Sequence, residues 1–400
     1  MNPTAGQTER ELAGAVRDWA AGIGPRIADA ERDGGLPADV IGDLGQLGVL
    51  GMSVPEKDRG LGASTVVFAL VLEEIAAAWP SLAIGVSVNS GIVAGSIVRY
   101  GTREQRARWL PRLIDGSGLG AFALTEAASG SDAAALRATA RRDGDGWVLN
   151  GRKHFVTNAD YAPLVIAFAR VGAAEEAVAM RVASRPGAPT PGAPAPAHAG
   201  ITAFIVPTDA RGVSLGPSER KMGLLASDTR ALVLEDARVG ADAVLGEVGR
   251  GFGIALAGLD GGRIGVAAQS IGIARAALAR AIGYARERRQ FGKPIVEFEA
   301  LRFSLARART DIDAARLLAL RAAWLRDRGC PFTREASMAK LFASEAAQRV
   351  TYQALQVFGG YGYMREYEVE RYARDARVTT LYEGTSEVQR MVIARSLVAA

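Results

Sequence analysis

The 400-residue chain is poor in cysteine and histidine, and each shortage excludes a kind of chemistry. The single cysteine, Cys330, cannot form a disulfide within the chain, and the two histidines, His154 and His198, are too few for a histidine-built metal site. His154 stands in a strand-like segment without any ligand spacing, which is typical of an ordinary strand side chain. We therefore expect no bound metal, so that redox chemistry would need an organic cofactor.

Long apolar runs and a signal sequence are also lacking. No window reaches the roughly 18 consecutive apolar residues of a membrane span, and the first ten residues lack a basic region followed by an apolar one. We therefore expect a cytoplasmic protein with no membrane partner. The net charge is +5 and the pI is about 9.5, but the basic residues are scattered, which argues against nucleic acid as a partner.

Hydrophobic periodicity divides the chain into three parts. Residues 1–118 show helical spacing, residues 119–245 show strand-like alternation, and residues 246–400 return to helical spacing, with apolar stripes that suffice for four helices. The predicted fold is α+β and multidomain. It has an N-terminal helical domain, a middle β-barrel-like domain and a C-terminal four-helix bundle.

The middle part carries clear strand and turn signals. Asp143–Gly146 and Asn150–Gly151 predict turns on either side of Trp147–Leu149, while 164–168 and 201–206 are predicted to be buried strands. A Pro/Ala-rich segment at about 172–200 cannot pair as a central strand, so we expect an exposed, mobile loop. The alternative is a Pro-rich docking motif, but no aromatic or charged specificity residues flank its prolines.

The most informative segment is Leu381-Tyr382-Glu383-Gly384-Thr385-Ser386-Glu387, which precedes the last predicted helix. A Glu beside a glycine can project its carboxylate into a cleft, because glycine permits a sharp turn. Thr385 is suited to cap the following helix, and Glu387 suits the positive end of the helix dipole. An ordinary helix N-terminus would need only these residue types, so the segment alone leaves both interpretations open.

Two further segments contain possible ligand contacts. Residues 121–132 run from an apolar strand into a hydroxyl-rich loop, which would expose backbone N–H groups and hydroxyls to an acceptor-rich ligand. The alternative is a strand end with an Asx-type turn. In 153–159 strand alternation places Phe155 and Thr157 on the same side, where they would offer a ring face and a hydrogen bond. The alternative is an ordinary sheet face.

These segments, with Arg286–Gly292 and Gln356–Gly362, closely resemble in order and separation the acyl-CoA dehydrogenase family of FAD-dependent flavoenzymes. The resemblance runs from about Leu12 to the C-terminus. It implies the same three-domain fold, assembled as a homotetramer, and dehydrogenation of an acyl-CoA thioester to the trans-2-enoyl-CoA. Glu383 would remove the α-proton, flavin N5 would accept the β-hydride, and an electron-transferring flavoprotein would be the electron acceptor.

The resemblance also implies roles for individual residues. Thr125 and Thr157 would bond the flavin ring, Ser131 the pyrophosphate, and Phe155 would be the aromatic wall beside the isoalloxazine. The adenine half of an FAD bound mainly by a neighbouring subunit would contact Arg288, Phe291, Gln356 and Gly360, with Thr385 and Glu387 beside the same dinucleotide. The substrate would contact Ser131, Arg263, Tyr382 and Gly384.

The chemistry fits a carboxylate on this turn. In the family the thioester oxygen is held by the backbone N–H of the catalytic Glu and by a ribityl hydroxyl of FAD, so the Glu383 turn would supply both the base and a donor. Because an α-proton is weakly acidic, the base must be stripped of water, and desolvation should raise the pKa of Glu383.

The sequence departs from the family at several positions. Ala127 stands where the family usually has Pro, and Phe155 where it often has Trp. Gly262 stands where the isovaleryl-specific branch carries its base, which leaves Glu383 as the candidate. No Arg stands near Ala83, where the glutaryl-specific branch has one, so a second substrate carboxylate is disfavoured. The residues from 259 to 274 and from 361 to 395 look most like short-chain and branched short-chain members, so we expect unfunctionalised acyl chains of C4 to C8.

Other functions remain open at this point. An acyl-CoA oxidase or a carrier-protein-linked dehydrogenase of the same fold would share these motifs. A DNA-associated alkylation-response homologue is supported only by the basic pI. The sequence has no G-x-G-x-x-G motif between a strand and a helix and no P-loop, which disfavours a Rossmann dehydrogenase or an NTPase.

Overall fold

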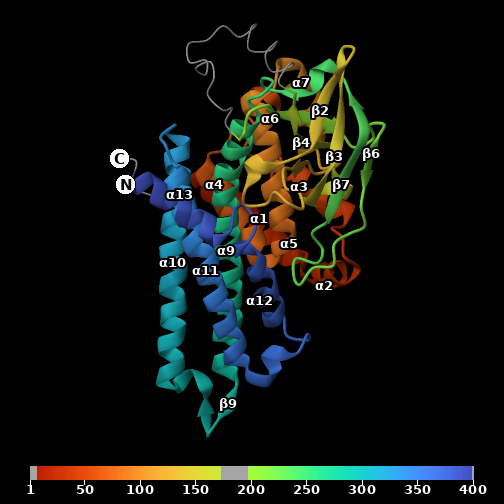
Figure 1. Cartoon of the computed structure of the whole chain (residues 1–400). Coiled ribbons are helices and arrows are strands. Elements are labelled where there is room, and N and C mark those ends of the chain that lie inside the picture. The colour runs from red at the N-terminus through yellow and green to blue at the C-terminus, as the bar shows by residue number, and fades with distance from the viewer. Residues whose placement is uncertain (1–6, 173–196, 399–400) are drawn as a thin grey trace.

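The computed structural model describes residues 7–172 and 197–398, and within these ranges it confirms the predicted multidomain α+β architecture (Figure 1). The Pro/Ala-rich segment predicted to be a loop at about 172–200 falls mostly on residues outside the described ranges.

The first part of the chain is helical. Its helices are α1 (Gln7–Gly22), α2 (Gly24–Asp33), α3 (Ala38–Gln46), α4 (Thr65–Ala78), α5 (Pro80–Val86), the π-helix η2 (Ser87–Ala94), α6 (Gly95–Tyr100) and α7 (Arg103–Ile114). Local signals set their starts: the Ser64 Oγ accepts a hydrogen bond from the Val67 N–H at 3.3 Å, and Thr102 and Gln105 form a capping box.

One stretch of this part, Pro80–Tyr100, is long and apolar enough to cross a membrane by length and composition alone. Polar residues such as Asn89 interrupt its apolar run, so it does not stand out in the sequence. However, 89% of its most apolar window is buried inside the protein. It is therefore explained as a core helix, packed between the sheet and α9 (Gly251–Glu287).

The middle part is a mixed sheet. Its strands are β1 (Ala121–Ala123), β2 (Thr139–Asp143), β3 (Gly146–Thr157), β4 (Leu164–Val171), β5 (Ile201–Pro207), β6 (Val213–Leu215), β7 (Thr229–Val239) and β8 (Val244–Leu245). The order is β6-β7-β3-β2-β4-β5-β8, and β1 pairs in parallel with β4. Both predicted buried strands are confirmed, since β4 and β5 are covered on both faces.

One turn prediction is right and one is wrong. β2 and β3 form a hairpin that turns at Gly144 and Asp145, as predicted. Asn150–Gly151, in contrast, lies inside β3, where the register with β7 shifts and Gly151 has φ +148°. The pair forms a β-bulge instead of a turn, and the Asn150 side chain fixes it by two hydrogen bonds with Asp236.

The last part returns to helices, of which α9 and two others lie side by side in Figure 1. After α9 come the short strands β9 (Arg289–Gln290) and β10 (Lys293–Pro294), then α10 (Glu299–Asp327), α11 (Thr333–Phe358), α12 (Val369–Arg377) and α13 (Ser386–Val398). Small residues let these helices approach closely. At Gly272 in α9, an added Cβ would lie 2.4 Å from the Glu73 carbonyl oxygen of α4.

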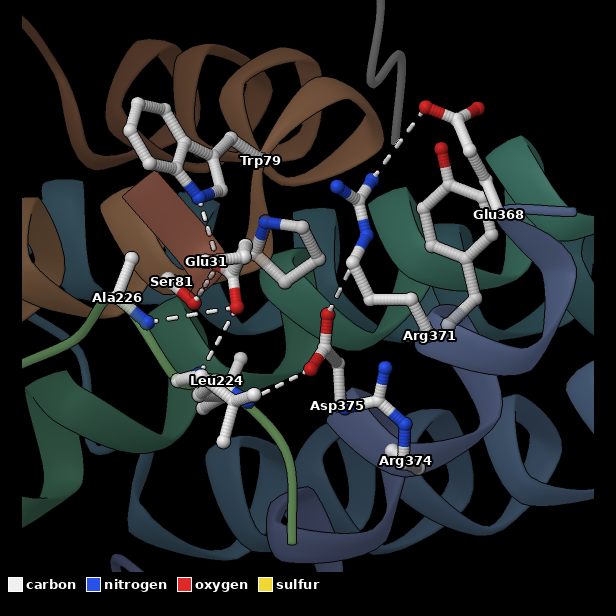
Figure 2. A network of polar contacts seen from close by, with 12 residues as sticks. Glu31, Trp79, Ser81, Leu224, Ala226, Glu368, Arg371, Arg374 and Asp375 are labelled. Carbon is white, nitrogen blue, oxygen red and sulfur yellow. Dashed lines mark hydrogen bonds and ion pairs between the residues drawn. The ribbon is translucent and has the colours of Figure 1, made fainter. Parts of the chain in front are cut away.

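Two buried carboxylates, Glu31 and Asp375, together join the three parts (Figure 2). Glu31 on α2 accepts hydrogen bonds from Trp79 Nε1 at 2.7 Å and Ser81 Oγ at 2.5 Å, and from the N–H groups of Leu225 and Ala226 in the loop before β7. The same loop is held from α12, where Asp375 accepts from the Leu224 N–H at 2.6 Å. These bonds fix the approach of the helices to the sheet.

We expect Glu31→Ala to lower the free energy of unfolding by about 2–4 kcal/mol, because four donors, most of them buried, lose their acceptor. Glu345→Ala is the matched control. Glu345 pairs with the exposed Arg390, so its loss should change stability by no more than about 0.5 kcal/mol. Urea unfolding followed by circular dichroism measures the stability of both variants. Equal losses of stability would show that the hydrogen bonds of Glu31 stabilise the fold no more than a surface ion pair does.

Candidate functional site

The predicted catalytic carboxylate lies on a strained turn between α12 and α13. Glu383 has φ +55° and Gly384 has φ +91°, so both adopt the left-handed conformation that is uncommon for a residue with a side chain. Hydrogen bonds from outside the turn hold it: Gln389 Nε2 donates to the carbonyls of Glu383 and Gly384, and Lys340 Nζ donates to the Gly384 carbonyl at 2.8 Å. The predicted cap is also present, since Thr385 Oγ1 accepts from the Val388 N–H.

One oxygen of the carboxylate is enclosed by protein. Glu383 Oε2 is buried and has no hydrogen-bond partner among the described residues. Burial raises the pKa of Glu383 to about 7, while the positive charges of Arg263 and then Lys340 oppose that rise. The predicted increase in the pKa of Glu383 is therefore confirmed, and its main cause is desolvation.

Glycine at 262 makes room for this carboxylate. A Cβ added to Gly262 would lie 2.4 Å from Glu383 Oε2 and 3.0 Å from Ile92 Cδ1. Any side chain at 262 would thus compete with Glu383 for the same space. This explains physically why only one of the two positions can carry an acidic group.

Two of the residues predicted to contact the substrate, Tyr382 and Arg263, form hydrogen bonds with other residues of the protein. The Tyr382 hydroxyl donates to Gln269 Oε1, and Gln269 in turn donates to the Pro80 carbonyl. Arg263 is 5% exposed and its guanidinium bonds Asp260 Oδ1 at 2.6 Å. Both residues flank Glu383, and their role as substrate ligands stays a prediction.

The hydroxyl-rich loop that follows β1 is held by a buried ion pair that the sequence analysis missed. Lys153, which is fully buried, donates to Glu126 Oε1 at 2.7 Å, and Glu126 also accepts from the N–H groups of Arg137 and Ala138. Burial alone would raise the pKa of Glu126, but the Lys153 ammonium and these N–H groups lower it overall. In the sequence this ion pair shows only as a single lysine within a strand-like segment, and nothing there identifies Glu126, 27 residues away, as its partner.

The aromatic wall is placed by a bulge. The register of β3 with β7 shifts between Lys153 and Val156, and Phe155 has φ +56° with 66% of its surface exposed. Phe155 and Thr157 both remain accessible on either side of the buried Val156, but the bulge means that simple alternation does not set their direction. The adjoining His154 N–H donates to the Thr125 carbonyl, which brings Thr125 beside β3. Ser131 is exposed in the same loop.

The loop and the carboxylate meet around one segment of α9. Ile92 of η2 lies against both Gly262 and Gly258, which are about one helical turn apart, and Phe122 of β1 also lies beside Gly258. The structure therefore gathers the strand that leads into Thr125, the apolar helix η2 and the Glu383 turn around the same stretch of helix.

The predicted adenine contacts lie elsewhere. A cavity of about 660 Å³ is lined by residues that include Arg288, Gly360 and Tyr361, and the Arg288 guanidinium lies over the Tyr361 ring at 5.5 Å. Phe291 is 93% exposed with φ +50°. Gln356 is exposed at the end of α11, near the cavity-lining Val357.

The cavity and the carboxylate are far apart in one chain. Tyr284, which also lines the cavity, is 22 residues after Gly262 in α9, which corresponds to about 33 Å along the helix at 1.5 Å per residue. In Figure 1, β9 lies at the opposite end of the long helices from α13. Thr385 and the exposed Glu387 stay with the carboxylate, on the turn and first residues of α13.

Three family patterns match the chain: the acyl-CoA dehydrogenase N-terminal domain over residues 6–117, the middle domain over 121–237 and the C-terminal domain over 249–398. The bovine mitochondrial short-chain specific acyl-CoA dehydrogenase is 42% identical over 98% of this chain and 90% of its own length. The structure of butyryl-CoA dehydrogenase from Megasphaera elsdenii covers all of both chains with a TM-score of 0.91 and 38% identity. A chain in a structure titled for an electron transferring flavoprotein of Acidaminococcus fermentans also covers all of both chains, with a TM-score of 0.93 and 37% identity.

The raised pKa of Glu383 predicts how Glu383→Gln changes stability with pH. Between about pH 4.5 and 7 the folded state keeps a proton that the unfolded state releases, so this carboxyl destabilises the fold increasingly as the pH rises through that window. A glutamine carries no such cost. We expect Glu383→Gln to raise the melting temperature at pH 8 and to have little effect at pH 5, whereas Glu345→Gln should show no such difference. An equal shift at both pH values would contradict the assigned burial.

Proposed function

The chain belongs to the acyl-CoA dehydrogenase family, and we propose that its substrates are short, unfunctionalised acyl-CoA thioesters, with Glu383 as the base. The protein is an FAD-dependent oxidoreductase that acts on a CH–CH bond of an acyl-CoA. When bound, FAD supplies the acceptor for the β-hydride. The protein must bind and orient the thioester and remove its α-proton.

The single observation that carries the role of Glu383 is its partnerless, buried Oε2 atom. A pKa of about 7 leaves much of the carboxyl ionised at neutral pH while keeping it basic enough to attract a proton. The Glu383 N–H donates to no other described residue, so it is available to the thioester oxygen, on which negative charge develops. The base and the oxyanion donor would then belong to one residue.

The chain's residues also fit a flavin. The exposed ring of Phe155 offers an apolar face to a flat ring system, and Thr125 and Thr157 lie on segments joined to that strand. We propose that Thr125 and Thr157 bond the flavin ring and that Ser131 reaches the pyrophosphate. Thr385 and Glu387 would lie beside a dinucleotide held by the α13 end.

The proposed chain length rests on the close packing of η2 against α9. Every residue of η2 is buried, and the Ile92 side chain fills the gap beside Gly258 and Gly262, next to the carboxylate. An acyl chain that passes Glu383 would meet this wall, which penalises long chains sterically, whereas each added methylene contributes only about 0.8 kcal/mol. Relatives named for short-chain and butyryl substrates support the same range.

Anaerobic bleaching of the flavin by acyl-CoAs of C4 to C16 tests the proposal. We expect butyryl- through octanoyl-CoA to reduce the flavin faster than palmitoyl-CoA, and glutaryl-CoA to react poorly. Faster reduction by palmitoyl-CoA, or reduction only by glutaryl-CoA, would overturn the proposed substrate range. The assignment of the protein as an acyl-CoA dehydrogenase would still hold. Rapid reoxidation by oxygen would favour an oxidase, and activity only on a carrier-protein thioester would favour the carrier-linked alternative.

We expect Glu383→Gln to lower turnover by about 10² to 10⁴, because the amide keeps the shape of the carboxyl but cannot take a proton. The purified variant should remain yellow, since no proposed flavin contact is lost. Flavin reduction by butyryl-CoA measured in a stopped-flow instrument gives the rate. A near-normal rate would rule out Glu383 as the base.

Gly262→Ala should also lower turnover, although it removes no functional group. The added methyl group would lie 2.4 Å from Glu383 Oε2, so the carboxylate must move, and small displacements of a catalytic group can cost up to about 10²-fold. Gly253→Ala in the same helix is the matched control, because nothing lies within 4 Å of its added Cβ. Equal steady-state rates for the two variants would show that Gly262 does not set the carboxylate position.

The separation of the two predicted FAD regions supports a homotetramer with FAD shared between subunits. The exposed Phe291 and the cavity beside Arg288 would then complete the site of a neighbouring subunit. We also propose an electron-transferring flavoprotein as the acceptor. The cytoplasmic location and the domain limits 1–118, 119–245 and 246–400 stay predictions.

Arg288→Ala should weaken FAD retention and the oligomer together, because a ligand that binds only the assembled state stabilises that state. Arg286→Ala, in the same exposed segment but outside the cavity lining, should retain both. Size-exclusion chromatography with absorbance at protein and flavin wavelengths measures the two properties in one run. An intact, fully yellow oligomer for Arg288→Ala would contradict the shared site.

A further inference from the structure

Lys340 is a fully buried lysine whose charge has no ion-pair partner within 4 Å among the described residues. The chain's other fully buried lysine, Lys153, is different because it bonds the Glu126 carboxylate directly. The Lys340 ammonium donates to one peptide carbonyl, that of Gly384, at 2.8 Å. Burying an ammonium group against a neutral acceptor is costly, so its retention at this place points to a role in the turn that it touches.

The hydrogen bond from Lys340 to the Gly384 carbonyl lies next to the proposed base, Glu383. Gly384 directly follows Glu383, and its carbonyl accepts from both Lys340 and Gln389. These donors come from α11 and α13, so they tie the turn to two helices at once. Because both turn residues have positive φ angles, the turn needs such fixed partners to keep its conformation.

The charges around Glu383 come from few elements. Arg263 faces it from α9, Lys340 from α11, and Tyr382 precedes it on its own turn. Lys340 in turn is influenced by Glu383, Arg263, Glu387 and Glu345. Arg263 already bonds Asp260, whereas Lys340 has no such carboxylate, so the Lys340 charge is the less neutralised of the two.

We propose that Lys340 is the positioning residue of the base: its ammonium group fixes the Gly384 carbonyl, holds the Glu383 turn in shape and favours the ionised carboxylate. This inference rests on the proposed role of Glu383. Burial lowers the pKa of Lys340 to about 8 and raises that of Glu383 to about 7, so near neutral pH both groups are charged to a large extent. Removing the Lys340 charge must raise the pKa of Glu383, because an attractive cation is lost.

Two variants of the holoenzyme, Lys340→Met and Lys340→Gln, separate the effect of the Lys340 hydrogen bond from the effect of its charge. Methionine keeps an apolar stem and has no donor, whereas glutamine can donate to a carbonyl without any charge. Lys221→Met is the matched control, because Lys221 Nζ also donates to a backbone carbonyl at 2.8 Å, that of Ser227, in the loop between β6 and β7. FAD absorbance and melting temperature report on folding in all three variants.

Two pH profiles give the decisive measurements. The first is flavin reduction by butyryl-CoA. The second is exchange of the α-protons of 3-thiabutyryl-CoA with deuterated solvent, which needs the base but no hydride transfer, because the β-position is sulfur. For Lys340→Met we expect the exchange rate to fall by about 10- to 100-fold at pH 7 and its acid limb to move upward by about one pH unit. Lys340→Gln should show the same shift in pH with a smaller loss of rate at high pH.

The outcomes are distinct. Wild-type rates and pH profiles for either Lys340 variant would overturn the proposal, and so would the same pH shift in Lys221→Met. If Lys340→Met lacks FAD, Lys340→Gln decides alone, and an unshifted profile there reduces Lys340 to a structural role. If Glu383→Gln exchanges α-protons normally, the proposed base itself is wrong. An inactive Glu383→Gln with an unaltered Lys340→Gln refutes only the inference about Lys340.

Discussion

The site depends on one constraint, which is that a carboxylate oxygen of Glu383 must stay buried and without a hydrogen-bond partner. A buried carboxylate oxygen without a hydrogen bond is unfavourable when charged, and the same burial raises the pKa of Glu383 to about 7. Gly262 gives the oxygen its space, and Ile92 lies against the same glycine. A base that reacts with a weakly acidic proton gains from the same lack of partners that weakens the fold.

Strain and long-range hydrogen bonds accompany this constraint. Phe155, Phe291 and Glu383 all have side chains and positive φ angles, and each is a residue for which the family resemblance implies a role. Such conformations persist when the surroundings determine them. Around Glu383 the surroundings are side chains from α11 and α13, and around Phe155 they include the bulge and the buried pair of Lys153 with Glu126.

The features that could be predicted from the sequence are those that depend on residues close to one another in the chain. The Glu383 turn, the Thr385 cap and the buried strands follow from neighbouring residue types, and the structure contains all of them. The bulge at Asn150–Gly151 resembled a turn because the same dipeptide serves both, and only pairing with β7 decides between them. The carbonyl that Lys340 contacts lies 44 residues away, and the partners of Glu31 lie 48 to 195 residues away, so no spacing rule could find them.

The length of α9 links the chemistry to the assembly. This 37-residue helix carries Gly262, which lies against the base, and Tyr284, which lines the cavity beside Arg288, and these two residues are about 33 Å apart along the helix. A rigid helix cannot bring both regions to one ligand within a chain. In the proposed tetramer a neighbouring α9 supplies the missing region. FAD binding would then stabilise the subunit association, and loss of the association would release FAD. The exposed aromatic side chain of Phe291 at the cavity end is then a surface that the assembly covers.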